Sequence, residues 1–337
     1  MKNTILSMKS LIYLALMLAL GQGAWAQGGP VEIYKLPSEK EHWISPTKYD
    51  YSRVAEQLTE GCQSNLEKIE AIYDWMTRTI AYDTSYSVRT ADGCFDAKKG
   101  VCQGYSELFY RIAEAAGLRV EIISGISRDI YGRVSDSGHA WLFAYTRENY
   151  GILIDPTWDA GTVNGNEFKR GSYHRGWFGV DPKWMILTHF PKEEEYQLLS
   201  DSMSEEEFRS LNYEFSLQYI YGFDVETIYT RARNHTLSMP KFYSGAAGDL
   251  IVLEAPLQAE FQVGESYFFR IRMMADKELI LVGDNWYSNL KEGWTDEGDG
   301  VYSITYKPSA PGQVSISLRE RGSAGQASVH IVYTVKS

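Results

Sequence analysis

Cysteine is scarce in this sequence. Among 337 residues there are three, Cys62, Cys94 and Cys102, and no two of them form the C-x-x-C pair of a typical structural zinc site. The histidines near them do not have ligand spacing, so we expect no metal ion. The acidic run at 296–300 lacks the spacing of an EF-hand loop, which argues against calcium dependence. We therefore expect a protein that works without a cofactor.

Positive charge and long apolar runs are also scarce. The 33 lysines and arginines are outnumbered by 44 acidic residues, and the net charge of −11 argues against nucleic acid or an anionic membrane surface as a partner. The apolar run Leu11–Leu20 is too short to cross a bilayer as a free helix. Lys2 and Lys9 precede this run, and Ala-Trp-Ala at 24–26 follows it. This pattern predicts a signal peptide over residues 1–26, with a membrane anchor as the alternative.

A cleaved signal peptide implies export to the periplasm or the extracellular space, without stable membrane insertion of the mature chain. Such compartments are oxidising. If Cys102 stays free, the disulfide left by elimination is Cys62–Cys94. A bridge between Cys94 and Cys102 would instead lock the thiol. The sequence does not decide whether either bridge forms.

Residues 100–110 predict a turn, then a cysteine, then a helix. Behind Cys102, apolar or aromatic residues recur at helical spacing, and Gly117 follows as a stop. These residues are Tyr105, Leu108, Phe109, Ile112 and Ala116. Cys102 is therefore expected at the helix N-terminus, where unpaired N–H groups and the helix dipole stabilise a thiolate. The alternative is a buried, unreactive cysteine.

Two later stretches supply partners for a reactive thiol. Residues 138–145 predict a strand that begins at His139, and residues 151–158 predict a strand that ends at Asp155. Paired as a hairpin, the two strands would bring His139 near Asp155. A thiol needs a base to hold it as thiolate, and that base needs a third group to fix its tautomer. Cys102, His139 and Asp155 are thus a candidate catalytic triad.

These pieces resemble the transglutaminase-like superfamily, whose core carries a Cys-His-Asp triad in this chain order. The matching pieces are Gly-Val-Cys-Gln-Gly-Tyr at 100–105, His-Ala-Trp at 139–141 and Asp-Pro-Thr-Trp at 155–158. Ile-Ala-Tyr-Asp at 80–83 and Thr-His-Phe-Pro at 188–191 resemble the branch that contains bacterial secreted members and the kyphoscoliosis peptidase. The resemblance covers roughly residues 60–200. The papain pattern fits worse, because its histidine lies roughly 130–150 residues after the cysteine.

The expected fold class is α+β, with the helix that carries Cys102 packed on an antiparallel sheet in a papain/transglutaminase-like core. An immunoglobulin-like β-sandwich is expected to follow, because several short alternating strands are separated by turn residues. After the signal peptide we expect a catalytic domain with an N-terminal arm over 27–200. A helical or mixed linker over 201–248 and the sandwich over 249–337 complete the chain.

Other segments have weaker local patterns. We expect a helix over 51–80, a turn-rich linker over 129–138 and edge strands at 177–178 and 184–187. Residues 83–100 and 159–176 are polar and bear glycine, so we expect both to form surface loops beside the site.

An acyl-transfer site also needs donors for the oxyanion. The backbone N–H of Cys102 is a natural first donor. In the family a side chain often supplies the second, and Tyr82 or Gln103 could do so here. Trp141 and Trp158 are expected to form walls of the site.

The remaining histidines compete with His139 for a role. They are His42, His174, His189, His235 and His330. His189 either touches the site or makes a structural hydrogen bond, and we favour the hydrogen bond. His330 alternates within a predicted strand and is expected at the surface.

The predicted function is that of an exported cysteine hydrolase or acyltransferase. It would act on peptide or amide bonds of a protein or peptide substrate, through a thioester on Cys102. Net hydrolysis is expected because the polar segments at 83–100 and 159–176 should admit water. The alternatives are a protein-glutamine crosslinking transglutaminase, or a non-catalytic binding or scaffold module on the same fold.

Overall fold

A computed structural model describes most of the chain after residue 30. The described residues are 31–36, 44–129, 132–170, 175–211, 223–243, 250–273, 277–283, 286–289, 293–322 and 327–337. The expected signal peptide, His42 and His174 lie outside them. In the described part, no helix has the length and apolar character needed to cross a membrane.

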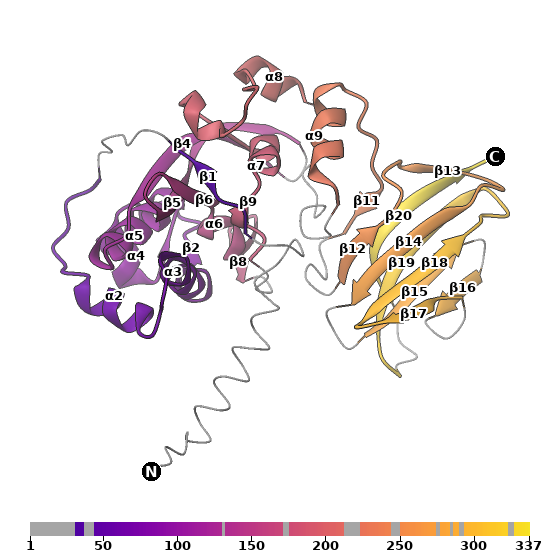
Figure 1. Cartoon of the computed structure of the whole chain (residues 1–337), viewed down its shortest axis with the longest axis horizontal. Coiled ribbons are helices and arrows are strands. Elements are labelled where there is room, and N and C mark those ends of the chain that lie inside the picture. Colours follow the sequence, from indigo (N-terminus) through magenta and orange to yellow (C-terminus); the bar gives the residue numbers. More distant parts are fainter. Residues whose placement is uncertain are drawn as a thin grey trace, which may run out of the picture.

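The first part of the chain combines helices with a curled sheet (Figure 1). Its helices are α2 (Ser52–Thr59), α3 (Asn65–Thr79), α4 (Ala91–Ala97), α5 (Cys102–Ala115), α6 (Pro156–Asp159) and α7 (Pro182–Thr188). Its strands are β1 (Tyr34–Lys35), β2 (Ala81–Tyr82), β3 (Lys99–Gly100), β4 (Val120–Arg128), β5 (Val134–Arg147), β6 (Tyr150–Ile154), β7 (Gly161–Asn164), β8 (Glu167–Arg170), β9 (Phe178–Val180) and β10 (His189–Pro191). The expected mixed fold, in which the helix that carries Cys102 packs beside an antiparallel sheet, is confirmed at this level.

The central sheet has the antiparallel order β1-β6-β5-β4-β10, and β9 also pairs with β6. Successive side chains of a strand point to opposite faces, and both faces of this sheet are buried. On one face Leu142 and Ile154 belong to the same apolar cluster as Phe109 of α5. On the other face Trp141 and Phe143 belong to a second cluster. The sheet therefore lies between two apolar layers and holds its strand ends rigidly.

Some local predictions were wrong, and capping residues explain the errors. The expected helix over 51–80 is two helices, because Gly61 adopts φ +82° and the Ser64 side chain caps α3. The expected edge strand at 184–187 is helix α7. Asp181 caps it, and a proline occupies its first turn.

The two expected loops and the linker also contain regular structure. Thr90 caps helix α4 within 83–100, and β7 and β8 form a hairpin within 159–176. The expected linker over 129–138 is shorter than predicted, since β5 already begins at Val134. The hydrophobic pattern alone did not reveal these short, half-exposed elements.

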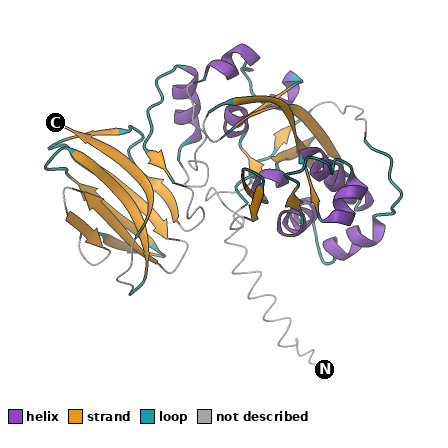
Figure 2. Cartoon of the chain, turned by 180° about the vertical axis from the view of Figure 1, so that it is seen from behind, coloured by secondary structure: helices purple, strands orange, loops and turns teal. Residues whose placement is uncertain are grey.

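Three short helical segments and a set of strands follow. They are η1 (Glu194–Gln197), α8 (Glu205–Ser210), α9 (Val225–Arg233), β11 (Lys241–Phe242), β12 (Leu250–Glu254), β13 (Glu260–Gln262), β14 (Tyr267–Met273), β15 (Lys277–Gly283), β16 (Trp286–Asn289), β17 (Thr295–Gly298), β18 (Val301–Tyr306), β19 (Gly312–Glu320) and β20 (Ser328–Lys336). One sheet has the order β11-β20-β19-β15-β16 with β13 beside β20, and the other has the order β12-β14-β18-β17. Figure 2 shows these strands as a lobe beside the helices and the central sheet.

Aromatic rings pack the two C-terminal sheets together. Phe261 stacks on Tyr267 with ring centroids 3.7 Å apart and on Tyr333 at 4.3 Å. The expectation that His330 is exposed was wrong, because its side chain is fully buried. The β19–β20 register passes from Ile331 directly to Val329, so His330 is the extra residue of a bulge and the simple alternation fails there.

Candidate active site

The nucleophile candidate lies where the sequence predicts it. Cys102 is the first residue of α5, and Val101 before it provides no side-chain cap. Gly117 adopts φ +74° just after the helix, as expected of a C-terminal stop. The short parallel pair β2–β3 sets Tyr82 opposite Gly100, two residues before the cysteine. The helix N-terminus thus presents the sulfur beside Tyr82.

Strand register brings His139 and Asp155 together. Leu142 pairs with Ile154, so Asp155, the next residue along, falls opposite Trp141. His139 lies two residues from Trp141 on the same face and is therefore a diagonal neighbour of Asp155. His139 Nε2 lies 2.6 Å from Asp155 Oδ2. The expected proximity of the two residues is confirmed.

Asp155 is a buried carboxylate with four donors around it. It caps α6, and its Oδ1 accepts hydrogen bonds from the N–H groups of Thr157 at 2.8 Å and Trp158 at 3.3 Å. Its Oδ2 faces His139 and, at 3.1 Å, Nε2 of His189. Burial disfavours its charge, but the two histidines outweigh burial and hold the pKa of Asp155 far below its usual range. The carboxylate is therefore ionised.

His139 joins this carboxylate to the thiol. Since Nε2 faces Asp155, the ring nitrogen left for Cys102 is Nδ1. Burial opposes charge on both groups, but Asp155 and Cys102 raise the pKa of His139 to about 10. Hydrogen bonds from His139 and from the Ala140 backbone outweigh burial and lower the pKa of Cys102. The pair is thus set to exist as thiolate and imidazolium.

The other two cysteines are in different surroundings. Burial raises the pKa of Cys94 to about 12, and Cys62 is half-buried with its pKa also raised by burial. All three cysteines lie in the described residues and all are free. The Cys62–Cys94 bridge is therefore absent from this structure. Cys62 follows α2 in a turn, whereas Cys94 is buried in α4 against Gly100.

Aromatic rings enclose the two site histidines. The ring of His139 lies 5.9 Å from that of Trp141 and 5.6 Å from that of Trp158. Trp177 packs edge-on against Trp158 at 4.8 Å and lies 5.0 Å from His189. Trp177 was not among the walls predicted from the sequence, where it was expected only in an edge strand. These rings cover the buried side of the two imidazoles.

The two candidate oxyanion side chains are placed differently. Gln103 donates its amide to the buried carboxylate of Glu107 at 3.0 Å, so this group is already engaged. Burial is the main cause that raises the pKa of Tyr82. The charge of the Cys102 thiolate raises it further, because the two side chains lie close together. The ring of Tyr86, which is 56% exposed, packs edge-on against Tyr82 at 6.1 Å.

A buried carboxylate that we did not single out from the sequence organises the loop beside the nucleophile. Asp83 is 1% exposed. It accepts hydrogen bonds from Ser85, from Ser87, from the Val88 N–H and from Lys99 Nζ. These groups outweigh burial, which opposes the charge, and hold the pKa of Asp83 well below its usual range. The sequence signal was the aspartate of Ile-Ala-Tyr-Asp followed by two serines.

His139, Asp155 and His189 also form a possible metal-binding group, since their ligand atoms lie within 4.8 Å of one another. A tetrahedral zinc ion would hold its nitrogen and oxygen ligands about 3.3 Å apart, given bond lengths of about 2.0–2.1 Å. Here His139 Nε2 and Asp155 Oδ2 are 2.6 Å apart, which is a hydrogen-bond distance. The arrangement therefore fits hydrogen bonding better than metal binding.

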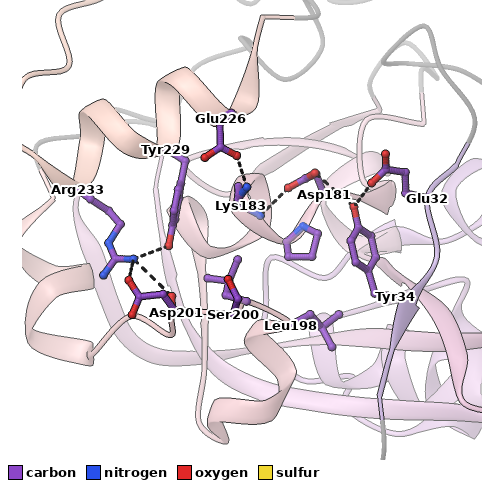
Figure 3. Close-up of a pocket in the computed structure, with 12 residues that line it drawn as sticks. Glu32, Tyr34, Asp181, Lys183, Leu198, Ser200, Asp201, Glu226, Tyr229 and Arg233 are labelled. Atoms are coloured by element: carbon purple, nitrogen blue, oxygen red, sulfur yellow. Dashed lines mark hydrogen bonds and ion pairs between the residues drawn. The ribbon is translucent and has the colours of Figure 1, made fainter.

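A cavity of about 520 Å³ lies away from the triad, where β1, α7 and α9 meet (Figure 3). In it the Tyr34 hydroxyl is 3.0 Å from Glu32 and 3.3 Å from Asp181. Arg233 contacts Asp201 at 2.9 Å, and Lys183 pairs with Glu226. Its lining contains none of the predicted site residues.

Comparison with known proteins gives matches in the same region. Residues 52–182 match the sequence model of the transglutaminase-like superfamily. The kyphoscoliosis peptidase of Mus musculus is 27% identical over 187 residues, which cover 52% of this chain and 28% of that protein. Hillarin of Drosophila melanogaster is 26% identical over 193 residues, which cover 51% and 24%. The match thus spans only about a quarter of the length of these relatives.

Solved structures give weaker matches. A protein of Cytophaga hutchinsonii described as a candidate cysteine protease is 20% identical, with a TM-score of 0.29, and covers 34% of this chain and 40% of its own. A structure described as a TGase is 16% identical, with a TM-score of 0.25, and covers 32% and 30%. At these scores we draw no conclusion from either likeness.

Proposed function

We propose that residues 52–182, which match the transglutaminase-like superfamily, form a cysteine hydrolase or acyltransferase that acts on peptide or amide bonds. The observation that carries the proposal is the chain of hydrogen bonds from Cys102 through His139 to Asp155. A thiolate already formed at a helix N-terminus is a strong nucleophile at neutral pH.

The proposed reaction uses the triad in two stages. The Cys102 thiolate attacks the carbonyl carbon, and the C–N bond breaks as the imidazolium of His139 gives its proton to the leaving amine. A thioester remains. His139 then takes a proton from water, the resulting hydroxide attacks the thioester, and the carboxylic product leaves while the sulfur returns to thiolate. Asp155 keeps the imidazole oriented and stabilises its charge throughout.

The oxyanion formed in each stage needs donors. We assign these to the Cys102 backbone N–H and the Tyr82 hydroxyl, because the Gln103 amide is bound to Glu107. Trp141 and Trp158 are assigned as walls that hold the imidazole of His139 in place.

Net hydrolysis is the proposed outcome, because the segments at 83–100 and 159–176 are polar in sequence and should admit water to the thioester. The test offers a peptide library with millimolar labelled primary amine and follows both products by mass spectrometry. New peptide termini or deamidated glutamines should exceed amine adducts, and the Cys102→Ala variant should give neither. Excess amine adducts would indicate a crosslinking transglutaminase. An absence of products, with a thiol that iodoacetamide does not modify at pH 7, would indicate a binding module.

Four broader proposals accompany this function. The chain is exported, on the strength of the signal-peptide pattern at 1–26. Its substrate is a protein or peptide. Its catalytic part covers 27–200, the linker 201–248 and the sandwich 249–337. The sandwich is immunoglobulin-like, since the orders β12-β14-β18-β17 and β20-β19-β15 correspond to the ABED and GFC sheets of that fold.

A further inference from the structure

A second histidine approaches the carboxylate oxygen that His139 uses. His189 opens β10, is fully buried, and holds its Nε2 3.1 Å from Asp155 Oδ2. His139 reaches the same oxygen at 2.6 Å, and the two imidazole rings are 5.1 Å apart. From the sequence, His189 was expected either to touch the site or to make a structural hydrogen bond. It does both, because its buried hydrogen bond is to Asp155 of the site.

The neighbours of His189 determine which nitrogen carries its proton. Because Asp155 is ionised, Nε2 must present a hydrogen to Oδ2. The Thr188 hydroxyl lies 2.8 Å from Nδ1 and 3.3 Å from the Met185 carbonyl, and the shorter contact favours donation of its hydrogen to Nδ1. His189 therefore sits as a neutral donor between a hydroxyl and a carboxylate.

His189 keeps its neutral form across the range in which the thiol would work. Burial, aided by the charge on His139, outweighs the attraction of Asp155 and lowers the pKa of His189 to about 4. The mobile proton of the site thus belongs to His139 alone. His189 supplies a hydrogen bond without competing for that proton.

All of the acceptor positions of the Asp155 carboxylate are occupied. The N–H groups of Thr157 and Trp158 occupy Oδ1, and the two histidines occupy Oδ2. An ionised carboxylate offers about four such positions. A buried carboxylate that loses one donor holds its negative charge less well and takes up a proton at higher pH.

We propose that His189 is a positioning residue that keeps Asp155 ionised and aimed at His139, so that the thiolate of Cys102 persists to lower pH. The inference rests on the proposed function for its purpose, but its hydrogen bonds do not depend on any substrate.

Few ionisable groups in the described residues face this carboxylate. Besides the two histidines and Cys102 of α5, Tyr82 of β2 and Tyr105 of α5 feel its charge. Burial raises the pKa of both tyrosines, so neither titrates at acid or neutral pH. Above about pH 5, where His189 with its pKa of about 4 stays neutral, the fall of thiol reactivity toward acid therefore reports on Cys102, His139 and Asp155.

Two substitutions of His189 by uncharged residues distinguish its hydrogen bond to Asp155 from the packing of its ring. In His189→Gln the amide nitrogen lies as many bonds from Cβ as Nε2 does, so it can still donate to Asp155. In His189→Asn the amide nitrogen takes the place of Nδ1 and cannot reach Asp155. A merely structural role predicts that both variants lose thermal stability without a difference in thiol reactivity.

The readout is the rate of Cys102 alkylation by iodoacetamide against pH, on the full chain and without substrate. The alkylation rate falls toward acid as the thiolate takes up a proton, and this part of the profile is the acid limb. We expect His189→Asn to move the acid limb upward by about one pH unit, so that about ten times less thiolate is present at a given pH within it. His189→Gln should stay within about a third of that shift. Equal acid limbs in wild type and both variants, or equal shifts in both variants, would overturn the inference.

A second measurement needs no variant and so does not depend on whether one folds. Nitrogen-15 NMR of the wild-type imidazoles should show His189 neutral and protonated at Nε2 from pH 5.5 to 8. An imidazolium, or a hydrogen at Nδ1, would overturn the inference. An ordinary thiol profile for wild-type Cys102 would instead contradict the proposed function, and the NMR result would still decide the role of His189.

Discussion

The Asp83 carboxylate accepts a hydrogen bond from the Val88 N–H at 2.9 Å. The Val88 carbonyl in turn accepts one at 3.0 Å from the N–H of Val101, which occupies the N-cap position just before Cys102. One buried charge thus fixes the loop that carries Tyr86 and joins that loop to the start of α5. The position of the thiol depends on a carboxylate that makes no contact with it.

Asp83→Asn should destabilise the fold in a pH-dependent way. The pKa of Asp83 is depressed in the folded chain, so its stabilisation is complete above the unfolded value of about 3.9 and is lost as the pH falls through the folded value. At pH 7 we expect a loss of about 1–3 kcal/mol, since several donors lose a charged acceptor. Thermal melts from pH 7 downward should show a constant gap from wild type down to about pH 4 and a closing gap below it.

The exposed pair of Asp136 with Arg209 provides the control for this measurement. Asp136→Asn should cost less than about 1 kcal/mol at any pH, because surface ion pairs contribute little. Equal losses in the two variants would show that the wrapped carboxylate of Asp83 has no special role.

Replacing the nucleophile should abolish turnover and leave the fold intact. Cys102→Ala removes the sulfur, and we expect a loss of at least about 10³-fold on any peptide substrate, with unchanged circular dichroism. Cys62→Ala removes a thiol of raised pKa and is the matched control, expected to retain full activity. Comparable turnover in Cys102→Ala and wild type would mean that another group performs the chemistry.

Asp155→Asn should be severe because the amide cannot balance the imidazolium charge. By analogy with the serine-protease triad we expect a loss of about 10³–10⁴ in kcat. Asp155 also caps a helix, and Asp181 caps α7 in the same way, through Lys183 N–H at 2.7 Å. Asp181→Asn therefore controls for capping alone and should leave kcat within about twofold of wild type. Similar losses in both variants would assign the effect to helix capping.

The contact between Gly100 and Cys94 should appear as a coupling energy. A Cβ on Gly100 would lie 2.8 Å from the buried sulfur of Cys94, which is too close for any side chain. Gly100→Ala alone should lower stability by about 1–3 kcal/mol through overpacking. Cys94→Ala removes the sulfur. In urea denaturation, the double variant should therefore lose less free energy of unfolding than the sum of the losses in the two single variants. Strict additivity would show that the backbone moves aside without cost.

Much of the site could be predicted from sequence, because its members belong to locally recognisable elements. A helical period behind Cys102 fixed its place at a helix start, and two strands joined by a turn brought His139 to Asp155. The role of Asp83 was missed although Ser85 and Ser87 follow it closely, because its burial and its ion pair with Lys99 arise only when β2 and β3 pair. Such contacts depend on tertiary structure and leave no period in the chain.

The errors in secondary structure have similarly local physical causes. An apolar run as short as 184–187 is compatible with strand or helix, and the deciding signals were the Asp181 cap and the proline after it. His330 was misplaced because one bulge shifts the alternation of its strand. Short apolar runs and bulges are where periodicity alone fails.

The position of β10 at the edge of the central sheet has a consequence for motion. This strand is three residues long, pairs only with β4 in the sheet order, and carries His189 at its first position. Edge segments of this length open and close without global unfolding. Each opening would free one lone pair of Asp155 while His139 and Cys102 stay in place. Hydrogen exchange at the β10 amides would then measure how often the thiol becomes less reactive in a chain that is otherwise folded.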